Sequence, residues 1–143
     1  MRVTQILLQK QARVVSVRPR EPVSAALKLM ASENIGALVV TDIVPTEGTT
    51  VLGMFSERDV VRALAAGGTD IMRLPVERLM SKKLISCSPN DDLADVMAKM
   101  DQHGIRHIPV LDEHTLVGVV GIRDVIHVLR GFVSGSDTMV PAA

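Results

Sequence analysis

The chain contains one pattern of residues twice. Two offsets relate the copies. Residues 14–42 match residues 84–112, which lie seventy positions later in the chain. Residues 52–64 match residues 117–129, which lie sixty-five positions later. Pro19 thus aligns with Pro89, and Asp59 aligns with Asp124. The offset changes where the first copy carries five extra residues at 46–50, which is typical of an insertion in a surface loop. The repeat therefore predicts two similar halves with a cleft between them.

Composition narrows the possible functions. The 143 residues suit one compact domain or two small halves sharing a core, and 47% of them are hydrophobic. Sixteen basic residues balance sixteen acidic residues, and the chain has no Trp or Tyr. A neutral chain without aromatic stacking platforms argues against nucleic acid or an anionic membrane as the main partner.

The cysteine content and the first residues of the chain indicate the cellular compartment of the protein. Cys87 is the single cysteine, which excludes an intrachain disulfide and fits a reducing compartment. The first twelve residues lack the apolar core of a signal peptide, and no apolar run is long enough to span a membrane. We therefore expect a soluble cytoplasmic protein.

Each copy predicts the order strand, helix, strand, strand, helix, which is an α/β (α+β) architecture of two β-α-β-β-α repeats. The first helix of each copy has apolar residues at i, i+3, i+4 and i+7, and the following strands are continuous apolar runs. Both faces of these strands should be covered. Glycines predict the ends of the last helices. The predicted elements are: short strands at 14–17 and 84–87; helix stripes at 23, 26, 27 and 30 and at 93, 96, 97 and 100; strands at 37–40, 52–55, 107–111 and 116–120; and helices from 57 to 66, before Gly67 and Gly68, and from 122 to 129, ending near Gly131.

The repeat also predicts the domain boundaries. Residues 1–66 form the first repeat with an N-terminal lead-in, 67–75 a linker, 76–130 the second repeat and 131–143 a frayed tail. Val3–Leu8 is similar to Val76–Met80, so each copy has its own lead-in.

The strings of the two copies resemble the CBS domain, named for cystathionine β-synthase. The resemblance covers Val3 to Leu129 and rests on paired strings in register: Ile35–Asp42 leading to Gly53–Asp59, and Gly104–Asp112 leading to Leu116–Gly118. It implies a tandem pair with pseudo-twofold symmetry, clefts between the copies and a disc-shaped homodimer. It also implies an adenine nucleotide ligand, with AMP preferred and ATP, ADP, NAD or S-adenosylmethionine as the other candidates, and regulation of a separate effector protein.

Ser56 and Asp59 stand where a strand turns into a helix. By resemblance, Ser56 contacts phosphate and Asp59 accepts hydrogen bonds from the ribose hydroxyls, beside the free N–H groups of a helix N-terminus. The same spacing is also that of a capping box, worth about 1 kcal/mol to the helix, and both roles can coexist. The second copy has Gly121 in place of serine but retains Asp124, so two equal nucleotide sites are not expected.

Arg106 and His107 begin a strand in the second copy, within Ile105–Pro109. By resemblance they reach the phosphates through charge-assisted hydrogen bonds. The alternative is a solvated Arg106 and a satisfied, partly buried His107. The first copy has Gly36 and Ala37 there, which allow close approach of a backbone or base.

The remaining candidates carry weaker signals. Ser16 and Ser86 either line an adenosine pocket or are ordinary strand-edge serines. Phe55 and Ile35 are candidates to flank an adenine ring, and Arg58 and Arg123 are surface charges that can bend toward a phosphate. The full set of predicted binding residues is Ser16, Ile35, Gly36, Ala37, Phe55, Ser56, Arg58, Asp59, Ser86, Ile105, Arg106, His107, Pro109, Gly121, Arg123 and Asp124.

Catalytic and metal chemistry have no sequence support. His103 and His107 are four apart, but Gly104 and a strand start intervene, so we expect no metal site. Cys87 is interpreted as a small buried hydrophobe. No paired acid and base or activated nucleophile emerges, so we expect no enzyme. The favoured hypothesis is a stand-alone regulatory module that signals nucleotide occupancy through a dimer, and the alternative is an interaction scaffold with vestigial sites.

Overall fold

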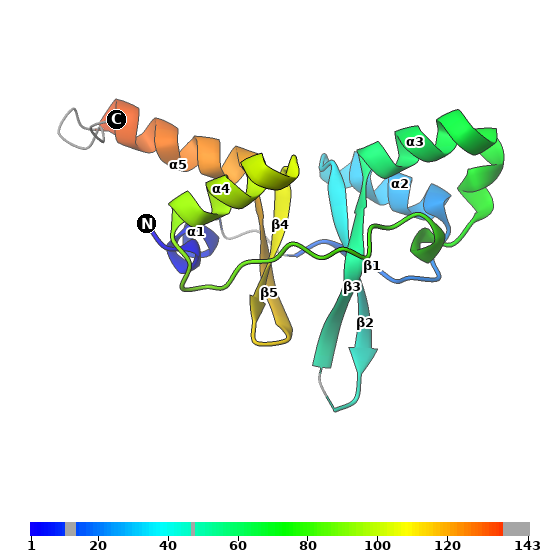
Figure 1. Cartoon of the computed structure of the whole chain (residues 1–143), viewed down its shortest axis with the longest axis horizontal. Coiled ribbons are helices and arrows are strands. Elements are labelled where there is room, and N and C mark those ends of the chain that lie inside the picture. The colour runs from blue at the N-terminus through cyan, green and yellow to red at the C-terminus, as the bar shows by residue number, and fades with distance from the viewer. Residues whose placement is uncertain (11–13, 47, 136–143) are drawn as a thin grey trace. The chain divides into compact units, whose positions relative to one another are not determined.

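The computed structural model describes residues 1–10, 14–46 and 48–135, with side chains to residue 131 (Figure 1). Contacts divide the chain into two compact units. The first-repeat unit contains Val14–Leu84 and His114–Leu116, and the second-repeat unit contains the described parts of Met1–Arg13, Ile85–Glu113 and Val117–Ala143.

The first-repeat unit packs its helices on a three-stranded sheet of order β1-β2-β3. Strand β1 runs parallel to β2, and β2 runs antiparallel to β3. Its elements are β1 (Ser16–Val17), α2 (Val23–Glu33), β2 (Ala37–Val44), β3 (Gly48–Ser56), α3 (Glu57–Gly67) and the 3₁₀ helices η1 (Gly68–Arg73) and η2 (Val76–Arg78).

The second-repeat unit repeats this order around a two-stranded sheet of β4 and β5. Its elements are α1 (Val3–Lys10), α4 (Leu93–His103), β4 (His107–Asp112), β5 (Thr115–Gly121) and α5 (Ile122–Gly135). Cys87 forms an isolated parallel bridge with Val110. The equivalent pair in the first-repeat unit, seventy residues earlier in the chain, is Val17 with Val40. The predicted mixed α and β fold is therefore confirmed.

Helix ends also repeat between the units. Helices α2 and α4 end at equivalent residues, Asn34 with φ 53° and Gly104 with φ 63°, both left-handed. Helix α3 ends before Gly68, whose φ is 64°, as predicted. Helix α5 instead continues through Gly131 to Gly135, so the predicted end near Gly131 is wrong. A glycine ends a helix by adopting the left-handed conformation, which has a positive φ. Gly131 does not adopt a positive φ, so the helix continues through it.

Each unit has its own aliphatic core between helices and sheet. Leu38, Val39 and Val40 are all buried, and neighbours on a strand point to opposite faces, so both faces of β2 are covered as predicted. Met97 departs from the prediction because it is 40% exposed, at the edge of the apolar stripe of α4. The buried residues of the two cores are Val17, Val23, Ala26, Met30, Leu38, Val40, Phe55, Val60 and Val76 in the first-repeat unit, and Val3, Ile6, Cys87, Leu93, Val96, Met100, Ile108, Val110, Val120, Val125 and Val128 in the second.

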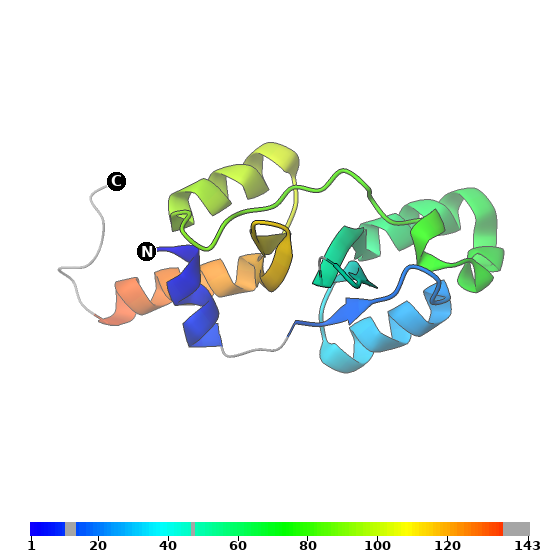
Figure 2. The same ribbon diagram turned by 90° about the horizontal axis from the view of Figure 1, so that it is seen from below.

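The two lead-ins are exchanged between the repeats. Helix α1, which precedes the first repeat, contacts α5 in the second-repeat unit (Figure 2). The same two backbone hydrogen bonds dock both lead-ins: Val3 N to Asp91 O (2.9 Å) and Thr4 N to Pro89 O (3.0 Å), and Val76 N to Glu21 O (2.8 Å) and Glu77 N to Pro19 O (3.0 Å). The lead-ins thus correspond at an offset of seventy-three. The predicted boundaries follow the repeats along the chain and do not coincide with the compact units, because residues 1–10 pack on the second repeat.

Several predicted segments are more regular, or shorter, than expected. Residues 48–50 of the insertion lie in β3, opposite Asp42–Val44, so the insertion lengthens a hairpin rather than only a loop. The predicted linker contains η1, whose Ile71 is buried. The first strand of each copy is reduced to a residue pair in one unit and a single bridge in the other. The predicted tail is helical to Gly135, and its remainder lies outside the described residues.

Candidate functional site

The start of α3 brings Ser56 and Asp59 together. Asp59 Oδ2 accepts hydrogen bonds from Ser56 N (2.8 Å) and Ser56 Oγ (3.1 Å), and Ser56 Oγ lies 3.4 Å from Asp59 N. Both residues are half-buried. The capping box is therefore confirmed. The carboxylate lies at the N-terminus of a helix, where the helix dipole favours a phosphate group. Ligand contact at this position stays a prediction.

The start of α5 is built differently. Gly121 N donates to Asp124 Oδ2 at 2.7 Å, which retains half of the capping box. Lys10 Nζ lies 3.0 Å from the same oxygen and donates to Val119 O at 2.7 Å. The sequence interpretation missed Lys10, because that residue reaches Asp124 only through the exchange of the lead-ins.

Each helix start is tied to the preceding strand start. Glu57 N donates to Gly36 O at 3.0 Å, and Ile122 N donates to Arg106 O at 2.7 Å in the second copy. The Glu57 carboxylate lies close to Gly36, since a Cβ on that glycine would be 3.3 Å from Glu57 Cδ. The strand-start candidates and the helix-start candidates of each copy therefore do form one local cluster.

The His107 ring packs beside Gly121. A Cβ on Gly121 would lie 3.4 Å from His107 Cδ2 and 3.6 Å from Asp124 Oδ2, which are ordinary contact distances. The position therefore has room for the serine that the first copy carries. His107 is half-buried, whereas Arg106 is exposed.

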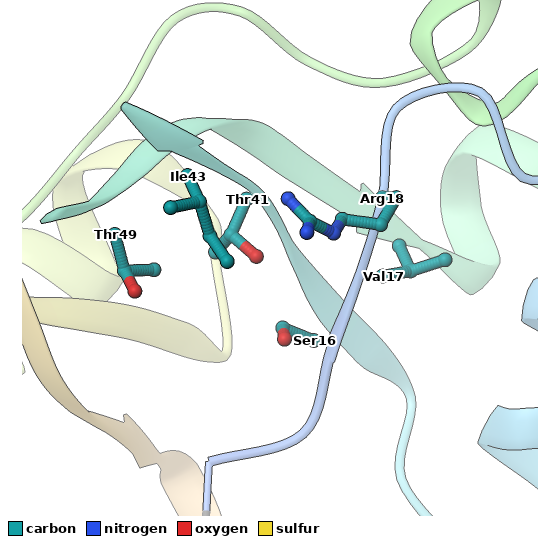
Figure 3. Close-up of a pocket in the computed structure, with 6 residues that line it drawn as sticks. All are labelled: Ser16, Val17, Arg18, Thr41, Ile43 and Thr49. Atoms are coloured by element: carbon teal, nitrogen blue, oxygen red, sulfur yellow. The ribbon is translucent and has the colours of Figure 1, made fainter. Parts of the chain in front are cut away.

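Ser16 lies away from the helix start, toward the tip of the hairpin. It is exposed on β1 opposite Val39 and lines a pocket of about 300 Å³ (Figure 3). Arg18 reaches over this pocket and its Nη1 is paired with Asp42 Oδ1 at 2.7 Å. The residues of the pocket are Ser16, Val17, Arg18, Thr41, Ile43 and Thr49. Ser16 on β1 is therefore separated from Ser56 on β3 by the central strand β2, and its contact with a ligand stays a prediction.

Phe55 lies in the core of the first-repeat unit. Phe55 pairs with Leu38, and both side chains are fully buried on the core face of the sheet. Contact of Phe55 with an adenine ring stays a prediction. The other candidates lie as follows: Ile35 and Ile105 are half-buried against the cores, Ala37 and Ser86 are half-buried, Pro109 is buried, and Arg58 and Arg123 are exposed. Ser86 O also accepts a hydrogen bond from Lys99 Nζ at 2.7 Å.

Cys87 is a core residue, as predicted, and is 4% exposed. The pKa of its thiol is raised from 9.0 to about 11, chiefly by burial and also by the nearby Asp91 carboxylate, while Lys99 acts in the opposite direction. A thiol with a raised pKa is a weak nucleophile because the thiolate is the reacting form.

We expect Cys87 of the native chain to react with a disulfide reagent at about pH 8 roughly a hundredfold more slowly than Cys87 of the unfolded chain. The same shift implies that its contribution to the free energy of unfolding is complete below pH 9.0 and is lost as the pH rises through about 11. Release of nitrothiobenzoate, followed in buffer and in concentrated guanidinium chloride, measures the two rates. Equal rates would show that the thiol is accessible in the folded state.

The described part of the chain has neither a cluster of metal ligands nor a membrane-spanning helix. Across residues 1–10, 14–46 and 48–135, no three His, Cys, Asp or Glu side chains gather as metal ligands would. In the same residues, no helix has the length and apolar composition needed to cross a membrane.

Comparison with known proteins agrees with the repeat and the fold. The CBS domain family matches residues 6–66 and again residues 76–131. The CBS domain-containing protein YhcV of Bacillus subtilis is 36% identical over 111 residues, which cover 78% of this chain and 75% of that protein. The chain therefore belongs to the CBS domain family and carries two CBS domains, so the predicted resemblance is confirmed.

Solved structures show the same architecture. A CBS-domain-containing protein from Agrobacterium tumefaciens has a TM-score of 0.82 and 33% identity, covering 90% of this chain and 98% of its own. A CBS domain protein from Pyrobaculum aerophilum, solved in complex with AMP, has a TM-score of 0.75 and 26% identity, covering 87% of this chain and 89% of its own.

Proposed function

We propose that this chain is a regulatory CBS pair that binds an adenine nucleotide, with AMP as the first candidate. The observation that carries the proposal is the cluster at the start of α3. There the Asp59 carboxylate and the Ser56 hydroxyl stand at a helix N-terminus, 3.1 Å apart and half-buried. A carboxylate can accept hydrogen bonds from both ribose hydroxyls, and a helix N-terminus favours phosphate. The AMP complex of the Pyrobaculum relative supports this choice of ligand.

The second copy supplies complementary groups. Arg106 is exposed and His107 is half-buried at the start of β4, and both are cationic or hydrogen-bonding side chains suited to phosphate. In the first-repeat unit we assign Ser56 and Asp59 to a ribose and its phosphate, and in the second-repeat unit we assign Arg106 and His107 to phosphate contacts. ATP, ADP, NAD and S-adenosylmethionine share the adenosine group and remain the competing ligands.

We further propose that the module works as a homodimer in the cytoplasm and passes occupancy to a separate effector protein. Val61 on α3 and Ile126 on α5 occupy equivalent positions of the two repeats and are 65% and 50% exposed. Leu64 adds to the apolar face of α3 and is 39% exposed. Exposed apolar residues repeated in this way favour burial against a second copy. A ligand can shift such an assembly only through its different affinity for two states.

An interaction scaffold is the second candidate function. It is favoured by two contacts that place protein groups near the proposed ligand positions: Lys10 on Asp124, and the Glu57 carboxylate beside Gly36. Catalysis is not part of either proposal, because the Ser56 and Asp59 pair serves as a helix cap.

Thermal unfolding with added nucleotides tests the proposed function. A ligand at a hundredfold excess over its Kd adds about 2.7 kcal/mol, which shifts Tm by roughly 5–10 °C for a chain of this size. We expect that shift with AMP and not with GMP, and ranking AMP against ADP, ATP, NAD and S-adenosylmethionine identifies the preferred ligand. No shift with any adenine ligand would support the scaffold.

A further inference from the structure

The two carboxylates at the helix starts are held by different partners. Asp59 Oδ2 accepts from the backbone N–H and the hydroxyl of Ser56, at 2.8 and 3.1 Å. Asp124 Oδ2 accepts from Gly121 N at 2.7 Å and lies 3.0 Å from Lys10 Nζ. The ammonium group of Lys10 therefore contacts the Asp124 oxygen that is equivalent to the Asp59 oxygen contacted by the Ser56 hydroxyl. The loss of the hydroxyl at Gly121 is matched by the gain of a cation from another element.

Contacts with the surrounding residues hold the Lys10 side chain in this position. Its Nζ also donates to Val119 O at 2.7 Å, and the side chains of Lys10 and Asp124 are only 27% and 20% exposed. Helix α1 is anchored in the core by Val3 and Ile6. A lysine in the last turn of a helix also interacts favourably with the helix dipole.

The lead-in of the first-repeat unit has a lysine at the equivalent position, but its helical turn ends before that lysine. At the offset of seventy-three set by the docking hydrogen bonds, Lys83 corresponds to Lys10. There, however, the helical turn η2 ends at Arg78, and Ser81 pairs with Met54 of β3 through hydrogen bonds of 2.8 and 3.0 Å. Lys83 therefore lies beyond the helical turn, in a segment that is neither helix nor strand, and it is exposed.

A carboxylate that is already paired with an ammonium group binds a ligand less strongly. A ribose that used Asp124 would have to displace the charge-assisted contact of Lys10, which is stronger than a hydrogen bond to a neutral hydroxyl. We propose that Lys10 is an internal competitor for Asp124, so that the chain takes up one adenine nucleotide through Asp59 and its second site stays closed until Lys10 is displaced. This inference rests on the proposed function, since it concerns the same class of site.

The number of AMP molecules bound per chain tests the proposal. Isothermal titration calorimetry with AMP compares the full wild-type chain, Lys10→Met, Lys10→Met combined with Asp124→Asn, and Lys83→Met as the matched control. We expect one AMP for the wild type and for Lys83→Met, two for Lys10→Met, and one again for the double variant. Circular dichroism checks that each variant is folded, and Lys10→Gln, which keeps a donor for Val119 O, replaces Lys10→Met if the latter unfolds.

The outcomes separate this inference from the proposed function. One AMP for both the wild type and Lys10→Met, two for the wild type, or weaker binding after the Lys10 substitution would each overturn the competition. Binding that appears only in Lys10→Met and disappears with Asp124→Asn would support the competition but overturn the assignment to Asp59. No AMP bound by any variant would overturn both.

Discussion

The substitution Asp59→Ala is expected to weaken AMP binding by at least about a hundredfold, because a ribose diol loses two hydrogen bonds to a charged acceptor, worth about 1.5–3 kcal/mol each. The same change should lower the free energy of unfolding by only about 1 kcal/mol, since it removes the reciprocal half of a capping box and no core contact. Calorimetric titration with AMP measures the first effect, and urea denaturation measures the second.

Asp95 offers a matched control for this experiment. It is the corresponding third residue of α4, and its Oδ2 accepts a hydrogen bond from Asp92 N at 3.3 Å. Asp95→Ala should have a similar small effect on stability and leave the AMP affinity unchanged. If Asp59→Ala bound AMP as tightly as Asp95→Ala, the assignment of the ribose to the start of α3 would fail.

The substitution Gly53→Ala is expected to lower the free energy of unfolding by about 2–4 kcal/mol, because the added methyl group would overlap backbone atoms that cannot move aside easily. A Cβ at Gly53 would lie 2.4 Å from Ser81 O and 3.1 Å from Met80 Sδ. Ser81 cannot yield easily, because its backbone is held to Met54 by two hydrogen bonds. Urea denaturation of the variant gives the change directly.

Gly118 is the equivalent glycine of the second copy and provides the comparison. A Cβ there would lie 2.7 and 2.9 Å from the two terminal methyl groups of Leu7, which can rotate away. We expect Gly118→Ala to cost about 1 kcal/mol. Equal costs at the two glycines would mean that the close approach of the Ser81 backbone is not what requires glycine at residue 53.

The local features of the site were predictable because they depend on residues close together in the chain. Ser56 and Asp59 are three apart, and their spacing alone predicts the capping box that the structure contains. The same argument works for Asp124, whose carboxylate caps Gly121 N. The burial of Phe55 was not predictable, because its face of β3 depends on the pairing with Leu38, which a continuous apolar run does not reveal.

The repeat, the order of strands and helices in each copy, and the candidate helix starts could all be predicted from the amino-acid sequence. These follow from periodicity, capping and turn residues, which act over a few positions. The repeat on which each lead-in packs, and hence the contact of Lys10 with Asp124, is visible only in the folded chain. The two lead-ins share an apolar pattern that either core could bury, so the choice between the cores depends on contacts between segments more than eighty residues apart, such as that of Val3 with Asp91.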